Sequence, residues 1–337
     1  MSDLEARLGN FRDSFQRVRS EVAKVLVGQD EVVEHTLISL FAGGHCLLEG
    51  VPGLGKTLLV RTLAKVLELE YSRIQFTPDL MPADIIGTRL VVESDRGGRE
   101  FQFQKGPIFG QIILADEVNR ATPKTQSALL EAMQEHEVTV GRDSHILEEP
   151  FLVLATQNPL EMDGTYPLPE AQLDRFLFKV NVPFPSRDEL TEVLTRTTDQ
   201  YTVELETVLN GPQIIEFQDL VRQIVVAPHV RDYAVRLLLA THPDQPGAPE
   251  AVRKYVRYGG SPRGVQAMLL GAKIVAALDG RYNVSFEDLR HVSVPALRHR
   301  MLLNFEGEAE GQSPDEILSS IATEVPEVAD DASPIAS

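Results

Sequence analysis

Short apolar runs alternate with a helical pattern along the first half of the chain. Three runs are almost entirely apolar: Cys46-Leu47-Leu48, Gln111 to Ala115, and Phe151 to Thr156. Runs without polar alternation are typical of strands buried on both faces of a parallel sheet. After the first run, Leu58 to Leu67 carries apolar residues at helical spacing, and Leu177 to Val182 predicts a further strand. The pattern predicts an α/β sandwich built on a parallel sheet.

The second half of the chain has a helical pattern almost throughout, because its apolar residues recur at three- and four-residue spacing. The predicted helices are Arg187 to Arg196, Phe217 to Val225, Val230 to Ala240, Val265 to Ala277, Phe286 to Leu303, and Ser313 to Ile321. The stretch from Thr241 to Glu250 is rich in Pro, Gly and Asp and predicts a loop. We therefore expect an α/β domain over residues 1–183, an all-α domain over residues 184–325, and an acidic disordered tail over residues 326–337.

Two hairpins are predicted inside the α/β domain. The first spans residues 88–104, where Asp95-Arg96-Gly97-Gly98 separates two apolar segments. The second spans residues 136–147, where Gly141-Arg142-Asp143-Ser144 turns the chain back. Both stand as insertions in the strand and helix pattern.

The charge balance limits the classes of partner. The chain of 337 residues has a net charge of −18, and the segment from Glu306 to Ser337 holds nine acidic residues and no Lys or Arg. Because a strongly acidic protein repels the phosphate backbone, we expect no general nucleic-acid binding, although a local basic pore would escape this argument.

Cysteine content and hydropathy favour a cytoplasmic protein. Cys46 is the only cysteine, so no disulfide within the chain is possible, which fits a reducing compartment. No stretch approaches the roughly twenty apolar residues that cross a bilayer, and Met1 to Asn10 is too charged for a signal peptide.

A glycine loop joins the first predicted strand to the helix that follows it. Its residues fit the phosphate-binding pattern GxxxxGK[ST]: Gly50, Val51, Pro52, Gly53, Leu54, Gly55, Lys56 and Thr57, with Leu58 opening the helix. In this context the backbone N–H groups surround a phosphate, Lys56 reaches the β and γ oxygens of ATP, and Thr57 holds Mg²⁺. The alternative is a glycine turn that happens to precede Lys-Thr, but the strand and the helix on either side favour the phosphate loop.

Two carboxylates end the second apolar run, Asp116 and Glu117. The carboxyl end of a buried parallel strand opens on the ligand crevice, so Asp116 is the candidate metal ligand beside Thr57. Glu117 is the candidate base that orients and deprotonates the attacking water. The alternative is an acidic pair that caps the next helix, near Thr122-Pro123, which explains one carboxylate better than two.

Three further polar residues follow in order along the chain. Asn158 comes after the third strand and is the candidate sensor of the γ-phosphate. Arg175 lies where a predicted helix, Leu168 to Phe176, meets the next strand. Arg263 projects from the first turn of a helix that Ser261 caps and Pro262 begins, where a cation can reach a phosphate. Each signal is weak alone, and their order gives them weight.

With these motifs the chain resembles the AAA+ ATPases, and within them the MoxR family, from about residue 20 to residue 325. The most specific matches are Arg73-Ile-Gln-Phe-Thr-Pro-Asp79 and Asn119-Arg-Ala-Thr-Pro-Lys124. The resemblance implies a P-loop NTPase core followed by an all-α lid. It also implies that Val27, Gly28 and Gln29 lie on the adenine side of the nucleotide.

The resemblance further implies how the protein works. Arg175 would be an arginine finger offered to the ATP of a neighbouring subunit, which requires a homo-oligomer, normally a hexameric ring. Arg263 would report the γ-phosphate to the lid, in its own subunit or in its neighbour. Clients in this family are commonly proteins with a von Willebrand factor A domain. The two hairpins resemble inserts that line or cap a central pore, and the alternative is that they are ordinary surface hairpins.

The leading prediction is an oligomeric, Mg²⁺-dependent ATP hydrolase that remodels, assembles or matures partner proteins in the manner of a chaperone. One alternative is a nucleic-acid motor, since helicases of the same clade share the two hairpins. Another is a nucleotide-gated module that does not hydrolyse ATP, although Glu117 and Arg175 are both present and argue against it.

Overall fold

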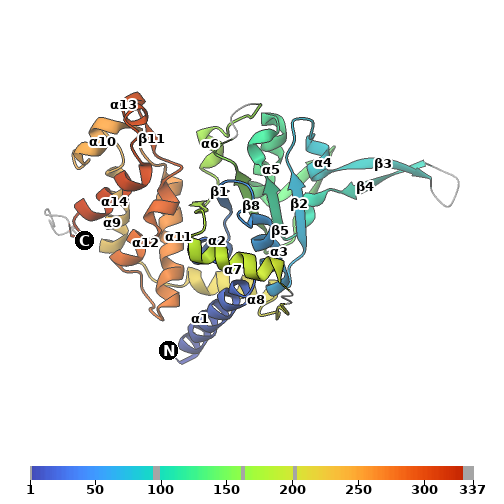
Figure 1. The fold of residues 1–337 in the computed structure, drawn as a ribbon, viewed down its shortest axis with the longest axis horizontal. Coiled ribbons are helices and arrows are strands. Elements are labelled where there is room, and N and C mark those ends of the chain that lie inside the picture. Colours follow the sequence, from blue (N-terminus) through green and yellow to red (C-terminus); the bar gives the residue numbers. More distant parts are fainter. Residues whose placement is uncertain (1, 94–98, 161–163, 200–202, 329–337) are drawn as a thin grey trace. The chain divides into compact units, whose positions relative to one another are not determined.

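The computed structural model describes residues 2–93, 99–160, 164–199 and 203–328. The chain forms two compact units (Figure 1). We call the first the sheet unit, Asp13–Phe176 with Val180–Phe217, and the second the helical unit, Met1–Arg12 and Leu177–Lys179 with Gln218–Ser337.

The sheet unit contains a five-stranded sheet in the order β2-β5-β8-β1-β9. The strands are β1 (Cys46–Glu49), β2 (Tyr71–Gln75), β5 (Ile112–Asp116), β8 (Leu152–Gln157) and β9 (Phe178–Asn181). β1 pairs with β8, β8 with β5 and β5 with β2, all in parallel, and Leu48 lies opposite Thr156. The carboxyl ends of β1, β5 and β8 therefore lie at one edge of the sheet, as the sequence predicted for a parallel α/β fold.

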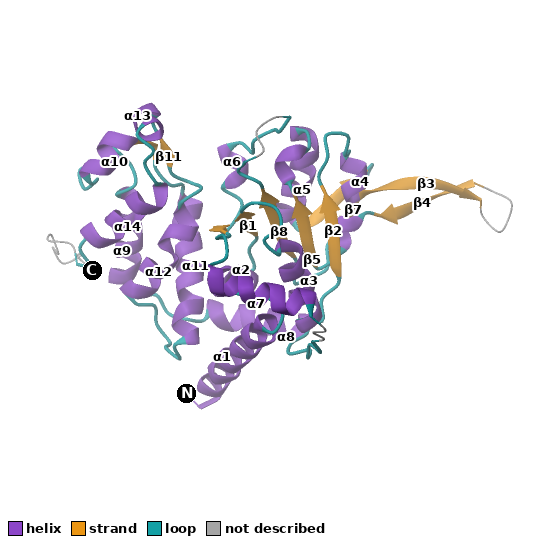
Figure 2. Cartoon of the chain, viewed as in Figure 1, coloured by secondary structure: helices purple, strands orange, loops and turns teal. Residues whose placement is uncertain are grey.

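Helices pack around this sheet (Figure 2). They are α2 (Asp30–Phe41), α3 (Lys56–Val66), α4 (Pro82–Ile86), α5 (Pro123–Glu135), α6 (Glu170–Leu173) and α7 (Arg187–Thr198), with 3-10 turns η1 (Pro107–Phe109) and η2 (Val118–Arg120). Two further helices, α1 (Ser2–Ala23) and α8 (Gly211–Arg222), are divided between the two units. The Ser186 side chain caps α7 and Glu189 completes the capping box. The helix predicted over Leu168 to Phe176 is the short α6 only.

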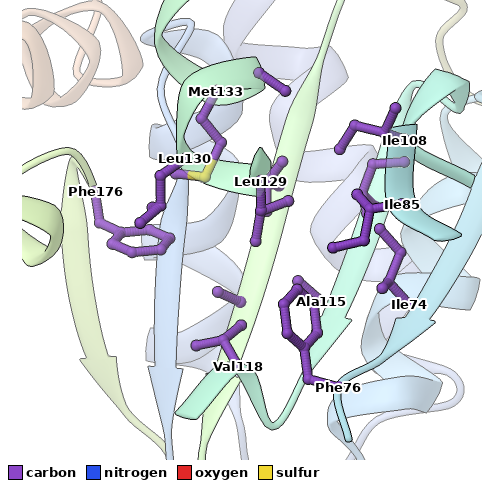
Figure 3. Close-up of a cluster of buried hydrophobic side chains, with 14 of the residues drawn as sticks. Ile74, Phe76, Ile85, Ile108, Ala115, Val118, Leu129, Leu130, Met133 and Phe176 are labelled. Atoms are coloured by element: carbon purple, nitrogen blue, oxygen red, sulfur yellow. The ribbon is translucent and has the colours of Figure 1, made fainter. Parts of the chain in front are cut away.

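A buried cluster fixes the sheet edge that carries the acid pair. It gathers Ile74 and Phe76 from the end of β2 with apolar residues of α4, η1 and α5 (Figure 3). Each large side chain that becomes fully buried contributes about 1.5–3 kcal/mol. Ala115 and Val118, on either side of Asp116-Glu117, belong to the same cluster, so the backbone around the two carboxylates is anchored in the core.

The division between the units lies at residue 217, later than the boundary predicted at residue 183. Phe41 on α2 packs against Phe15 and Phe217, with ring centroids 5.9 and 6.2 Å away. Arg196 on α7 donates from Nη1 to the carbonyl oxygens of Ala23 and Lys24, at 2.9 Å each. These contacts hold α7 and most of α8 to the sheet unit. The all-α lid domain over residues 184–325 stays a prediction.

Both predicted hairpins are present. β3 (Gly87–Glu93) pairs antiparallel with β4 (Arg99–Lys105), and the turn predicted over residues 95–98 lies outside the described residues. β6 (Glu137–Val140) pairs with β7 (Asp143–Ile146), so the second turn is shorter than predicted. The hairpins contact each other, because the Phe103 and His145 rings stack at 4.0 Å and Arg89 pairs with Asp143.

The helical unit contains several of the predicted amphipathic helices, together with two short helices, α10 and α13, that the sequence did not predict. It holds α9 (Pro228–Leu239), α10 (Glu250–Tyr255), α11 (Pro262–Leu278), α12 (Phe286–Leu297), α13 (Phe305–Ala309) and α14 (Pro314–Glu324). The helix predicted over Phe286 to Leu303 ends at Leu297, and β11 (Leu302–Leu303) then pairs with β10 (Val256–Tyr258). Within α12, the buried Asp288 forms an ion pair with Arg281, whose Nη2 lies 2.6 Å from Asp288 Oδ1.

The end of the chain is described as far as residue 328. Arg236 donates to the carbonyl oxygens of Pro326 and Glu327, so the start of the predicted tail is tied to α9. Residues 329–337 of that tail lie outside the described residues. Across the described part of the chain, no helix is long and apolar enough to cross a membrane.

Candidate nucleotide-binding site

The glycine loop between β1 and α3 has the backbone that a phosphate cradle requires. Gly53 and Gly55 have φ angles of +84° and +79°, a left-handed conformation that side chains disfavour. Gly55 also precedes α3 as its N-cap residue, and a glycine has no side chain with which to cap the N–H groups at that end of the helix. Unpaired N–H groups at a helix N-terminus attract an anion. Gln29 supports the loop from outside, donating from Nε2 to the Leu54 carbonyl oxygen at 2.5 Å.

Lys56 turns back toward the start of the loop. Its Nζ donates to the carbonyl oxygen of Gly50 at 2.5 Å. Burial lowers the pKa of the Lys56 ammonium group, while the carboxylates of Asp116 and Glu117 act in the opposite direction. The ammonium group therefore belongs to the same electrostatic environment as the acid pair at the end of β5. Thr57 and Leu58 follow in the first turn of α3.

The acid pair is held by a hydroxyl from the neighbouring strand. Glu117 has φ 56° and ψ 52°, a left-handed conformation that costs a non-glycine residue of order 1–3 kcal/mol. Its N–H donates to Thr156 Oγ1 at 2.9 Å, and that hydroxyl donates to Asp116 Oδ1 at 2.6 Å. Thr156 is almost fully buried on β8. Sequence reasoning did not give Thr156 this role, because it depends on β8 lying beside β5.

Strand β2 supplies two more side chains to the acid pair. Arg73 Nη2 donates to Asp116 Oδ2 at 2.7 Å, and Gln75 Nε2 donates to Glu117 Oε2 at 3.0 Å. Arg120, three residues after Glu117, also donates to Glu117 Oε2, at 3.1 Å. Sequence reasoning missed these contacts. The available signal was the i, i+2 spacing of Arg73 and Gln75, which places two polar side chains on one face of a strand.

The structure places the remaining predicted residues as follows. Asn158 is buried just after β8, and its Oδ1 accepts from the Leu160 N–H at 3.1 Å. Arg175 is half-buried after α6, and its buried Nε has no hydrogen-bond partner among the described residues. Arg263 lies in the helical unit, in the first turn of α11, where Ser261 caps the helix as predicted. Within the sheet unit, the structure brings Lys56 into the electrostatic environment of Asp116 and Glu117, whereas the site roles of Asn158, Arg175 and Arg263 stay predictions.

A cavity of about 320 Å³ lies beside the glycine loop, within the sheet unit. Val27 and Gln29 line it, together with Leu54 and Leu58 of the loop and α3, and their role on the adenine side stays a prediction. Its other wall comes from the segment at and before α7: Phe184, Leu190 and Val193. Sequence reasoning missed this second wall. Gly28 between Val27 and Gln29 has φ +71°, which only glycine adopts readily.

No group of three or more His, Cys, Asp or Glu side chains suited to a metal ion occurs in the described ranges. A hydroxyl and one carboxylate, completed by phosphate and water oxygens, is instead the donor set that Mg²⁺ accepts at a nucleotide. Thr57 and Asp116 would supply that pair. The residues present therefore fit Mg²⁺ bound together with ATP.

The fold and the site define a P-loop ATPase of the AAA+ class. The family description "ATPase family associated with various cellular activities (AAA)" matches residues 45–178, and "AAA lid domain" matches residues 249–321. A crystal structure titled as a putative ATPase from Cytophaga hutchinsonii superposes with a TM-score of 0.89 at 41% identity, covering 96% of this chain and 98% of that one.

Within that class the relatives identify the family. The chain is 42% identical to Chaperone MoxR1 of Mycobacterium tuberculosis over 309 residues, which are 91% of this chain and 81% of that protein. It is 32% identical to Protein MoxR of Methylorubrum extorquens, covering 89% and 90% of the two chains. The chain belongs to the MoxR family of AAA+ ATPases.

Proposed function

We propose that this protein hydrolyses ATP, in the presence of Mg²⁺ and across the interface between subunits, to remodel, assemble or mature partner proteins. The observation that carries the proposal is the pair Asp116-Glu117, held by Thr156 at the sheet edge from which the glycine loop also begins. A chain that only bound nucleotide would not need two carboxylates fixed there.

ATP fits the glycine loop and the cavity beside it, both of which belong to the sheet unit. The loop from Gly50 to Thr57 would receive the phosphates through its N–H groups and Lys56. The adjacent apolar cavity would receive the adenine ring of ATP between Val27 and Val193. Thr57 and Asp116 would hold Mg²⁺, which neutralises charge on the phosphates when bound.

Hydrolysis needs a base next to the terminal phosphate. Glu117 is that base in our proposal, because it follows the metal ligand directly and its backbone is fixed by the bond to Thr156. Asn158, at the end of the next strand, would hold the attacking water or the γ-phosphate through its side-chain amide. The Asp116 carboxylate and the Lys56 ammonium group would keep the phosphates in line with that water.

Arg175 supports the oligomeric part of the proposal. It is half-buried just after α6, where the chain leads into β9, and its terminal Nη groups are the part of the side chain that could meet a phosphate from outside. These groups would bind a phosphate of a neighbouring subunit's ATP, as an arginine finger does in other nucleotide hydrolases, where it increases the rate by about 10³–10⁵. We infer a ring, normally hexameric in this family, with Arg263 sensing the γ-phosphate from the helical unit.

The partners in this proposal are proteins, of which those with a von Willebrand factor A domain are the first candidates. The relative named Chaperone MoxR1 supports this choice of partner over nucleic acid, and so does the net charge of −18.

The test has two stages. Wild type, Lys56→Ala and Glu117→Gln are compared for ATP turnover with and without Mg²⁺, and only wild type with Mg²⁺ should release phosphate. Glu117→Gln is then purified in Mg·ATP, with wild type in ADP as the control. Enrichment of a defined protein partner only in the ATP-trapped sample would support remodelling. Turnover by Lys56→Ala, or enrichment of nucleic acid in place of protein, would contradict the proposal.

A further inference from the structure

The carboxylate of Asp116 has a donor on each oxygen. Thr156 donates to Oδ1 at 2.6 Å, and Arg73 donates to Oδ2 at 2.7 Å. The Thr156 hydroxyl is part of the fixed sheet interior, whereas Arg73 reaches across from β2, the edge strand. Oδ2 is therefore the oxygen that an incoming cation would meet, and a guanidinium group already binds it.

The Arg73 side chain binds Asp116 Oδ2 but is exposed enough to leave it. Its backbone is fixed on β2, where Arg73 lies opposite Leu114, two residues before Asp116. Its side chain keeps 42% of its surface exposed, against 15% for Asp116. The same Nη2 donates to Gln75 Oε1 at 2.6 Å, which steers the guanidinium group toward the acid pair. The arginine can swing into solvent without disturbing the buried cluster.

We propose that Arg73 is a built-in competitor for the divalent cation at Asp116. In the absence of nucleotide its guanidinium group neutralises the carboxylate, and it leaves Oδ2 when the metal binds with ATP or ADP. The inference rests on the proposed function, because it concerns the metal site of that reaction. Two cations within hydrogen-bonding distance of one carboxylate oxygen repel each other, so occupancy by one excludes the other.

This competition has a measurable consequence for the metal. Removing the Arg73 charge should make Asp116 available and lower the Mg²⁺ concentration needed at the site. The contact is partly exposed, so the change should be about two- to fivefold, the range that ion pairs of this kind support. Nucleotide binding without metal should not change, because Arg73 has no role in the glycine loop.

The experiment titrates Mg²⁺ into protein with a fluorescent ADP analogue and follows the tightening of nucleotide binding, so no turnover is involved. Arg73→Gln should reach half-saturation at about two- to fivefold less Mg²⁺ than wild type. Arg73→Lys, which keeps the charge, should lie closer to wild type. The matched control is Arg142→Gln, which removes one positive charge from the turn between β6 and β7 and should behave as wild type.

A double-mutant cycle with Asp116→Asn isolates the contact. Adding Arg73→Gln to Asp116→Asn should leave the Mg²⁺ midpoint unchanged, because the competed carboxylate is then gone. An unchanged or higher midpoint in Arg73→Gln alone would overturn this inference, and weaker binding of the analogue in EDTA would show that Arg73 contacts nucleotide instead. A wild type that binds no nucleotide would overturn the proposed function, and this inference with it.

Discussion

The hydroxyl of Thr156 accepts a 2.9 Å hydrogen bond from the backbone N–H of Glu117. The same hydroxyl donates to the Asp116 carboxylate, so one buried side chain on β8 fixes both members of the acid pair. It also stabilises the left-handed backbone at Glu117, a conformation that is strained because the residue is not glycine. The proposed base therefore depends on a residue that would not itself touch the substrate.

We expect Thr156→Val to uncouple nucleotide binding from turnover. Valine keeps the shape but leaves the Glu117 N–H without its partner, which should cost about 1–3 kcal/mol in stability. Turnover should fall by about 10- to 100-fold, because Glu117 and Asp116 lose their alignment. Binding of ADP in EDTA should stay at the wild-type level. Thr156→Ser retains the hydroxyl and should restore most of the turnover, and a Ser variant as slow as Val would refute the hydrogen-bonding role.

We expect Glu117→Gln to bind ATP and fail to hydrolyse it. The amide keeps the size of the side chain but cannot accept a proton, so the rate should fall by about 10²–10⁴. Phosphate release and equilibrium ATP binding are measured on the same preparation. Glu135→Gln, at the exposed end of α5, removes one negative charge away from the acid pair and serves as the control. Turnover near the wild-type level in Glu117→Gln would assign the base to another residue.

Arg175 should act on the ATP of a neighbouring subunit. Arg175→Ala alone and Glu117→Gln alone should both be nearly inactive. In an equal mixture, about one quarter of the interfaces would combine an intact Glu117 with an intact Arg175, so activity should recover to roughly that fraction. Steady-state phosphate release from assembled mixtures measures it. Mixtures no more active than the sum of their parts would place Arg175 in its own subunit's site or outside catalysis.

His45 should make the stability of the sheet unit depend on pH. Its Nε2 lies 3.0 Å from the Met133 carbonyl oxygen and its Nδ1 accepts from the Val153 N–H, an arrangement that suits the neutral ring. Burial is the main reason that the pKa of His45 is lowered to about 4 from the ordinary 6.5; the hydrogen bond to Met133 opposes this shift, and the neighbouring His136 adds a smaller lowering. The folded chain therefore resists a proton that the unfolded chain takes up.

The sign follows from this difference. The contribution of His45 is complete above about pH 6.5 and is lost as the pH falls toward 4, amounting to about 2 kcal/mol between pH 7 and pH 5. In His45→Gln the amide can donate to Met133 and accept from Val153, but it does not titrate. We therefore expect the free energy of unfolding of this variant to fall by about 2 kcal/mol less than that of wild type between pH 7 and pH 5. Urea unfolding at both pH values measures the difference. Equal losses in wild type and variant would show that other groups cause the acid sensitivity.

The chain pattern alone predicted most of the strands and helices of the fold. The apolar runs predicted β1, β5 and β8, and the three- and four-residue spacing predicted α3, α9 and α11. Where the prediction went wrong, tertiary contacts decided. The helix predicted through Leu303 stops at Leu297 because the chain beyond it pairs with β10. The packing of Phe217 against Phe41 is a further contact between residues far apart in the sequence that no local pattern predicts.

For the site, the sequence by itself determined the groups that a short local motif identifies. The glycine loop, Lys56, Thr57 and the two carboxylates after β5 could be found because each is defined by its neighbours along the chain. Thr156, Arg73 and the second wall of the cavity at Phe184 could not be found, since each acts through a partner far away in sequence. Only the order and register of the strands, set by how apolar surfaces pack in three dimensions, brought Arg73 and Thr156 to the two oxygens of Asp116.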